Sequence, residues 1–113
     1  MTFNEKNYSI AMTRGDSESL SVQCTTDPFD AGDTVTFTVR EDAEGEILLQ
    51  KVVTDFVGGV AVIGISPEDT QNIEFGDYVY DVQAKWAEGT VLTLIPPKPG
   101  RLPNFTLTEE ATY

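Results

Sequence analysis

Acidic side chains are the residues of this sequence whose spacing could support chemistry. Three aspartates lie in DPFDAGD (27–33), and three acidic residues lie in DAEGE (42–46). Such loops could bind calcium through carboxylate oxygens, and two carboxylates could pair as in a glycosidase. Neither loop has the EF-hand spacing, and glycosidase chemistry needs a concave site. Aspartate and glycine also form turns, so we expect these acids to shape turns and to bind no metal.

The other groups that catalysis commonly uses are scarce. The chain has no histidine, which excludes the usual Ser-His-Asp, Cys-His and zinc sites. It has no glycine-rich phosphate loop. Cys24 is the single cysteine, so no disulfide can form within the chain, and we expect this thiol to pack as a small apolar side chain. We therefore predict a protein that is not an enzyme, with no catalytic residues and no cofactor.

Aromatic residues share one face of the predicted strand 77–86. Tyr78, Tyr80 and Trp86 alternate with polar residues, which is typical of a strand with one buried face. Such a stripe could stack against a sugar, but it more often belongs to the core, and we expect core here. Asp81 interrupts the strand, where aspartate is disfavoured. It either faces solvent on the outer side of the sheet or marks a contact with another subunit, and we expect solvent.

Alternation with a period of two dominates the chain and is typical of strands. The segments that we predict to be strands are 7–13, 19–25, 34–40, 46–54, 60–65, 77–86, 90–95 and 104–108. We expect the first and the last of them at sheet edges. Ser66, Pro67 and the two acidic residues after them are typical of a helix start, so we predict one short helical turn near residues 67–72. The 113 residues should form a single domain.

Short strands at this spacing indicate an all-β fold, an immunoglobulin-like antiparallel β-sandwich of seven or eight strands. In that fold a tyrosine near the start of the sixth strand bonds back to the preceding turn. Tyr78 stands at this position, after Gly76 and after a short turn that contains Asp69. Cys24 and Tyr80 occupy the two places where an immunoglobulin domain carries its disulfide. We therefore predict this sandwich without its usual disulfide.

The tripeptide Arg14-Gly15-Asp16 matches a motif that integrins recognise. It falls between two predicted strands, where Gly15 suits a chain reversal and Asp16 can bond to local amides. Adhesion through this motif requires secretion, and the N-terminal segment has no signal-peptide pattern. We therefore predict that the motif forms the first corner of the sandwich and does not bind integrins.

Charge narrows the range of partners. The formal net charge of −12 disfavours nucleic acid and anionic membranes, which attract basic surfaces. No apolar run approaches the roughly 20 residues of a membrane helix. We predict no nucleic-acid or membrane partner and a protein that is made in the cytoplasm.

Four stretches together resemble a known family. They are IAMTRGDSESLSVQ, GDTVTFTVRE, ISPEDTQNIEFGDYVYDVQ and GTVLTLIPPKPGRLPNFTLTEEAT. The series is similar to small structural proteins of phages and prophages of Gram-positive bacteria, which resemble the N-terminal domain of siphophage baseplate upper proteins. The residues that carry the resemblance most specifically are Asp69, Thr70, Gly76, Tyr78, Tyr80, Asp81 and Gln83.

The resemblance implies a non-enzymatic virion protein of the tail or baseplate. Such a protein docks to other virion proteins, including further copies of itself, after assembly in the bacterial cytoplasm. A full baseplate protein continues beyond this domain into a receptor-binding platform, so we expect the sandwich alone, and the resemblance does not carry a host-recognition role over to this chain. Two alternatives remain from the residues themselves: a carbohydrate- or cell-surface-binding sandwich that uses calcium, and a small hydrolase that uses paired acids.

Overall fold

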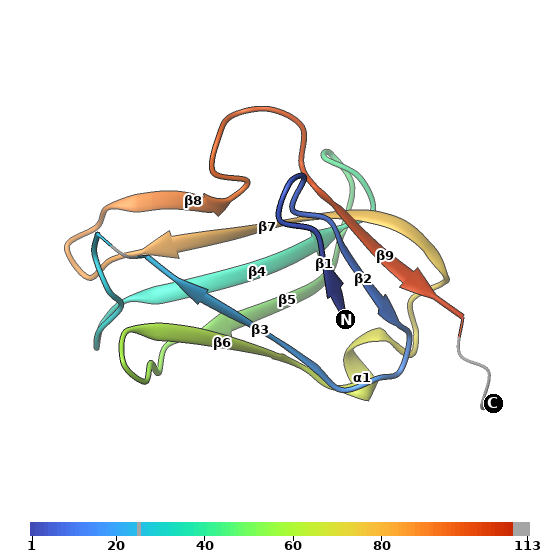
Figure 1. Ribbon diagram of the computed structural model, residues 1–113, viewed down its shortest axis with the longest axis horizontal. Coiled ribbons are helices and arrows are strands. Elements are labelled where there is room, and N and C mark those ends of the chain that lie inside the picture. The colour runs from blue at the N-terminus through green and yellow to red at the C-terminus, as the bar shows by residue number, and fades with distance from the viewer. Residues whose placement is uncertain (25, 110–113) are drawn as a thin grey trace.

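The computed structural model describes residues 1–24 and 26–109. These residues form a two-layer β-sandwich of nine strands with one short helix (Figure 1). The elements in chain order are β1 (Thr2–Phe3), β2 (Ile10–Thr13), β3 (Glu18–Gln23), β4 (Thr34–Arg40), β5 (Ile47–Val53), β6 (Val60–Ile65), α1 (Pro67–Thr70), β7 (Gly76–Lys85), β8 (Val91–Ile95) and β9 (Asn104–Thr108). The all-β sandwich predicted from the alternating pattern is confirmed. Thr25, the last residue of predicted strand 19–25, and the end of the family resemblance at 110–112 lie outside the described residues.

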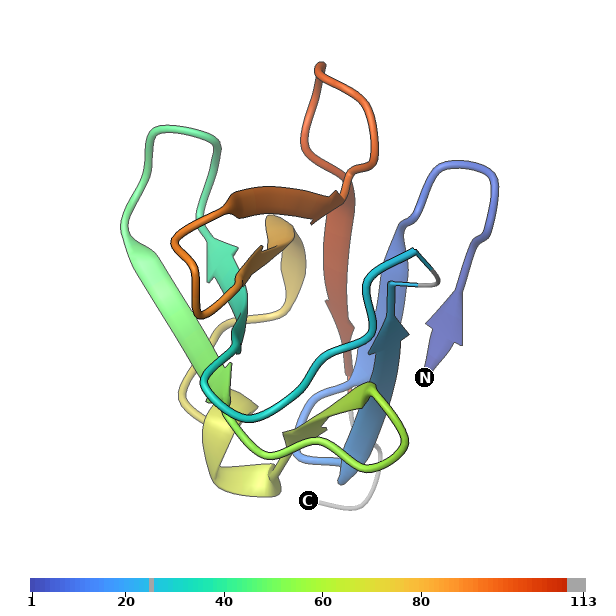
Figure 2. The same cartoon turned by 90° about the vertical axis from the view of Figure 1, so that its left-hand side faces the viewer.

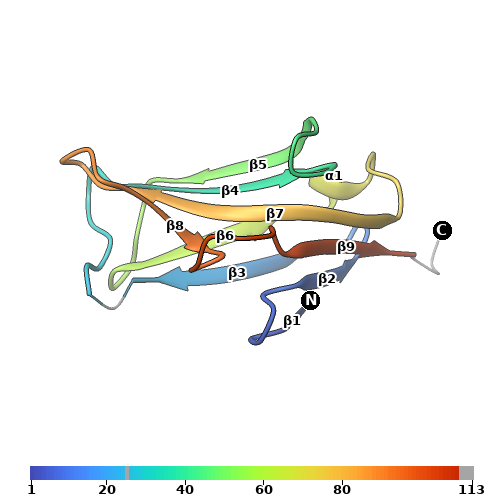
Figure 3. The same ribbon diagram turned by 90° about the horizontal axis from the view of Figure 1, so that it is seen from above.

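The two layers are unequal in size (Figure 3). The larger sheet has the order β1-β2-β9-β7-β4-β5, and β8 also pairs with β7. The smaller sheet contains only β3 and β6 among the described residues. Strand β7 is the centre of the large sheet because its whole length pairs with neighbours: β9 along its first half, β8 along its second half, and β4 on the other side.

The core lies between the layers and contains the aromatic stripe of β7. Tyr80 is 1% exposed, and its ring lies 5.5 Å from Phe37 and 6.4 Å from Phe105. Trp86 is 7% exposed and packs on Phe29, with ring centroids 5.7 Å apart. Burial of such large rings supplies much of the hydrophobic stabilisation of a domain. The prediction that this stripe belongs to the core is confirmed for Tyr80 and Trp86, whereas Tyr78 is half-buried and packs against the margin of the core.

The predicted edge positions of the first and last strands are wrong. Strand β9 lies inside the large sheet, between β2 and β7, and β2 lies between β1 and β9. The pairing of β2 with β9 is parallel, so the sheet is not wholly antiparallel. Residues 7–9 precede β2 and are not part of a strand. Periodicity reports which face of a strand is buried, but it does not report which strands flank it, and so both errors concern pairing.

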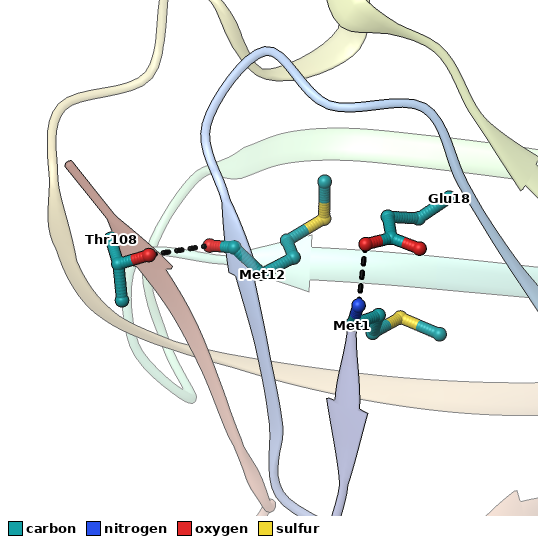
Figure 4. Close-up of polar contacts among 4 residues, drawn as sticks. All are labelled: Met1, Met12, Glu18 and Thr108. Atoms are coloured by element: carbon teal, nitrogen blue, oxygen red, sulfur yellow. Dashed lines mark hydrogen bonds and ion pairs between the residues drawn. The ribbon is translucent and has the colours of Figure 1, made fainter. Parts of the chain in front are cut away.

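Side-chain contacts hold these terminal strands to their neighbours (Figure 4). The hydroxyl of Thr108 donates to the backbone carbonyl of Met12 at 3.4 Å, across the β2–β9 pair. The amino group of Met1 contacts the Glu18 carboxylate at the start of β3. The tyrosine hydroxyl of Tyr80 donates to the carbonyl of Tyr8, in the loop before β2. The described ends of the chain are therefore built into the sandwich.

Candidate docking surface

The Arg14-Gly15-Asp16 turn is a structural corner between β2 and β3. Gly15 has a φ of +85°, which favours glycine, and its amide donates to the hydroxyl of Thr70 at 2.9 Å. Thr70 is fully buried at the end of α1. The guanidinium of Arg14 lies 4.0 Å from the centroid of the Phe75 ring and donates to the carbonyl of Ile73. The predicted corner is confirmed, and Arg14 is packed against the following turn.

Helix α1 begins as predicted and is anchored to the large sheet. The backbone amide and the hydroxyl of Ser66 donate to the Asp69 carboxylate at 2.8 and 3.0 Å. The same carboxylate forms an ion pair of 2.9 Å with Lys51 on β5. Burial alone would raise the pKa of Asp69, but the hydrogen bonds from Ser66 and the contact with Lys51 outweigh it and lower the pKa. Asp69 is therefore a structural link between α1 and β5.

The predicted tyrosine bond back to the preceding turn is present. The hydroxyl of Tyr78 donates to the carbonyl of Glu74 at 2.7 Å. Gly76, between them, has a φ of +145°, which lets the chain turn into β7. Burial raises the pKa of Tyr78, and the negative charges of Glu74 and Glu41 raise it further. This bond is the feature from which the immunoglobulin-like arrangement was predicted.

The acidic loops serve the backbone. Asp33 is 6% exposed, and its two carboxylate oxygens accept hydrogen bonds from the amides of Asp30 and Ala87. In the second loop Asp42 accepts from the amide of Glu44 at 2.9 Å. No group of three metal-ligating side chains exists among residues 1–24 and 26–109. These contacts agree with the prediction that the acids shape turns.

The outer side of the large sheet presents a different surface. A shallow depression of about 440 Å³ lies over β5, β4 and β7. Its lining residues, named here the outer face, are Thr36, Thr38, Arg40, Gln50, Val52, Asp81 and Gln83. They include one acid and one base, although the chain carries 19 acidic residues. The outer face is thus nearly neutral and rich in groups that can both donate and accept hydrogen bonds.

Asp81 lies on the β7 side of the outer face. It stands across from Thr38 in the β4–β7 pair and is half-buried. Burial raises the pKa of Asp81, and the nearby positive charge of Arg40 opposes that shift. The expectation that Asp81 faces the outer side is correct, and its exposure to solvent is partial. Leu102, from the loop after β8, lines a crevice with Asp81.

Two loops with opposite charge border the outer face. The turn between β4 and β5, named here the acidic hairpin (residues 41–46), carries four exposed carboxylates. The segment between β8 and β9, named here the basic loop (residues 96–102), carries exposed Lys98 and Arg101 and no acid. Arg40 fixes the acidic hairpin by donating to the carbonyl of Gly45 at 2.9 Å. Both loops project to the same side of the molecule (Figure 2).

The residues singled out in the sequence therefore fall into three places. One group surrounds the first corner and α1, and it comprises Gly15, Asp16, Asp69, Thr70, Gly76 and Tyr78. Tyr80 and Trp86 belong to the core. Asp81 and Gln83 lie on the outer face. Because Trp86 is buried, it cannot serve as a platform for sugar stacking.

Sequence reasoning missed Arg40, Thr38 and the basic loop. The sequence did contain a signal, because four of the seven basic residues lie at the ends of β4 and β7 or in the basic loop. They are Arg40, Lys85, Lys98 and Arg101. No acidic residue occurs from position 89 to position 108. Charge mapped along predicted strands would have shown this imbalance.

No protein-family model and no curated protein matches the chain. The described residues also contain no helix long and apolar enough to cross a membrane.

Proposed function

We propose that this protein is a non-enzymatic structural component of a phage or prophage virion, in the tail or baseplate, that acts by docking to other virion proteins. The observation that carries the proposal is the outer face, a nearly neutral sheet surface on a chain of net charge −12. Surfaces that become buried in interfaces are depleted of charge at their centre, whereas free surfaces of acidic proteins need not be. Val52, which lines this face, is 58% exposed and adds apolar area to it.

The family resemblance supports the same proposal. Its most specific residues build the corner and the central strand β7, which is the strand that carries Asp81 and Gln83 onto the outer face. A docking role needs surfaces and a rigid scaffold, and it needs no catalytic group. The central position of β7, paired along its whole length, provides that rigidity.

Virion purification after prophage induction tests the proposal. The protein should copurify with particles on a density gradient and appear in their mass spectrum in a fixed ratio to the tail proteins. Flanking tail, capsid or holin genes are expected as well. A protein that stays in the soluble lysate, encoded in a housekeeping operon, would overturn the virion assignment.

A matched pair of variants tests the role of the outer face. Gln83→Glu adds an acid to the exposed part of the outer face, whereas Ser21→Glu adds the same charge on exposed β3 in the opposite sheet. A like or unpaired charge in an interface costs several kcal/mol, and 1.4 kcal/mol corresponds to about tenfold in affinity. Incorporation of Gln83→Glu into particles should therefore fall at least about tenfold, while Ser21→Glu assembles normally. Equal incorporation of both variants would exclude the outer face as the docking surface.

A further inference from the structure

We propose that the outer face binds a second copy of this chain in a two-fold arrangement, in which the acidic hairpin of each copy contacts the basic loop of the other. This inference rests on the proposed docking function, because it names the partner of the same surface. The charge pattern at the border of the outer face supports this arrangement, because the face itself is nearly neutral. A neutral centre permits a second copy to approach, and the charged borders determine its orientation.

The two charged loops lie on either side of β7. The acidic hairpin joins β4 to β5, and the basic loop joins β8 to β9 on the other side of β7. Their bases meet at one crevice, which is lined by Arg40 from the end of β4 and by Leu102 from the basic loop. Both loops then project in the same direction beyond the sheet (Figure 2). A partner seated between them would contact both.

A two-fold axis determines which loops of the two copies meet. In an isologous interface each contact between two different surface elements occurs twice. A two-fold axis in the interface and parallel to β7 exchanges the two sides of the face, so it places each acidic hairpin opposite a basic loop. The carboxylates of the hairpin then lie near Lys98 and Arg101 of the second copy. Packing in which each side meets its own kind would set four carboxylates against four, which is repulsive.

The other faces of the molecule are poorly suited to self-association because of their charge. Outside the outer face and the basic loop the chain has a large excess of acids, since Lys98, Arg101 and Arg40 are three of only seven basic residues. Two copies carrying −12 each repel through most other surfaces. The outer face is the region where that repulsion is replaced by attraction.

The size of the surface predicts a weak dimer. The three strands of the outer face at about 4.8 Å and seven residues at about 3.3 Å give a sheet area of roughly 14 by 23 Å before the loops are added. Even with the loops such an area is at the low end for specific interfaces, so we expect dissociation constants on the order of micromolar. Because the charged loops are exposed, the dimer should weaken strongly as the ionic strength rises.

Charge exchange between the loops tests the arrangement. The double variant Lys98→Glu with Arg101→Glu makes both borders of the outer face acidic. The double variant Glu44→Lys with Glu46→Lys replaces two of the four carboxylates of the acidic hairpin by positive charges. Each double variant alone should dimerise at least tenfold more weakly than wild type in sedimentation velocity at low salt. An equimolar mixture of the two should form a heterodimer that is tighter than the dimer of either variant alone, because the unchanged hairpin again meets a basic loop, and the lysines introduced into one hairpin meet the glutamates introduced into the other loop. Glu5→Lys with Glu68→Lys changes the net charge by the same amount as the hairpin variant and should dimerise as wild type does.

The outcomes separate this inference from the proposed function. A wild-type protein that remains monomeric at hundreds of micromolar in low salt, with no heterodimer in the mixture, overturns the dimer. A dimer that ignores the loop exchanges overturns the arrangement. If a double variant were misfolded by circular dichroism, dissociation of the wild-type dimer by 1 M salt supports the charged contact, and resistance to salt overturns it. In each of these cases a loss of virion incorporation in Gln83→Glu would still support docking to a different virion protein.

Discussion

Replacement of Thr70 by valine tests whether the Arg14-Gly15-Asp16 turn is a structural corner. Valine has nearly the shape of threonine, so the change leaves no cavity and removes one hydroxyl. That hydroxyl accepts the 2.9 Å bond from the Gly15 amide, and Thr70 is fully buried. The amide would then be left without its partner in a partly buried corner. Loss of one partner from such a bond costs about 1–3 kcal/mol of unfolding free energy.

Urea denaturation with amide exchange measures the effect. For a domain of this size a loss of about 2 kcal/mol lowers the urea midpoint by roughly 1 M. Exchange of the Gly15 amide should accelerate in the variant. Thr54→Val, at an exposed position, is the control and should change stability by less than about 0.5 kcal/mol. The expected shift of the urea midpoint is roughly 1 M. A Thr70→Val midpoint within about 0.3 M of the wild-type midpoint, with the Gly15 amide still protected from exchange, would therefore refute the corner as a stabilising feature.

Three further substitutions address the links around β7. Tyr78→Phe removes the bond to the Glu74 carbonyl and should cost about 1 kcal/mol in urea denaturation; no change would show that the bond contributes nothing. Asp69→Asn removes a carboxylate whose pKa is lowered by the fold, so its stability contribution is present above the ordinary pKa of 3.8 and is lost as the pH falls through the folded value. The stability gap between wild type and Asp69→Asn should therefore be widest near neutral pH and close in acid, and a gap independent of pH would contradict this. Asp81 has a raised pKa, so its charged form opposes folding above the folded pKa, and that penalty shrinks as the pH falls below the folded pKa and is gone below the ordinary value of 3.8. Asp81→Asn should accordingly melt at a higher temperature than wild type at neutral pH and lose the advantage in acid; a lower melting temperature at pH 7 would show that Asp81 stabilises the sandwich.

The strands could be predicted closely where one face is buried and the other is polar. Segments 34–40, 60–65 and 104–108 coincide with β4, β6 and β9. In β4 and β9 branched and aromatic residues alternate with polar ones, and burial follows the same period apart from buried Thr38. Segment 60–65 is instead a short continuous apolar run, which is also typical of a strand. The helical turn was equally accessible, because Ser66 and Pro67 are local signals for a helix start.

The pairing of strands could not be predicted from the same signals. Strands β2 and β9 are more than 90 residues apart in the chain and pair in parallel, as in the register of Ile10 with Phe105. That pairing is set by the packing of the whole sandwich. The two-residue strand β1 is too short to show a period.

The candidate docking surface depends on the same long-range pairing. Asp81, Arg40 and Leu102 meet only because β4 and the basic loop lie on either side of β7. From sequence alone Asp81 was an isolated anomaly with two explanations. Its half-buried position in a crevice that Leu102 also lines distinguishes it from an ordinary solvated residue.

Hydroxyl-radical footprinting of purified particles tests most directly whether the protein docks through its outer face. Val91, across from Lys85 on the outer side of the large sheet, and Val62, on the opposite sheet, are 51% and 52% exposed in the free protein, which makes them matched probes. Oxidation of Val91 and Val52 should fall in the assembled particle while oxidation of Val62 stays at its free value. Protection of Val62 with full oxidation of Val91 and Val52 would contradict docking through the outer face.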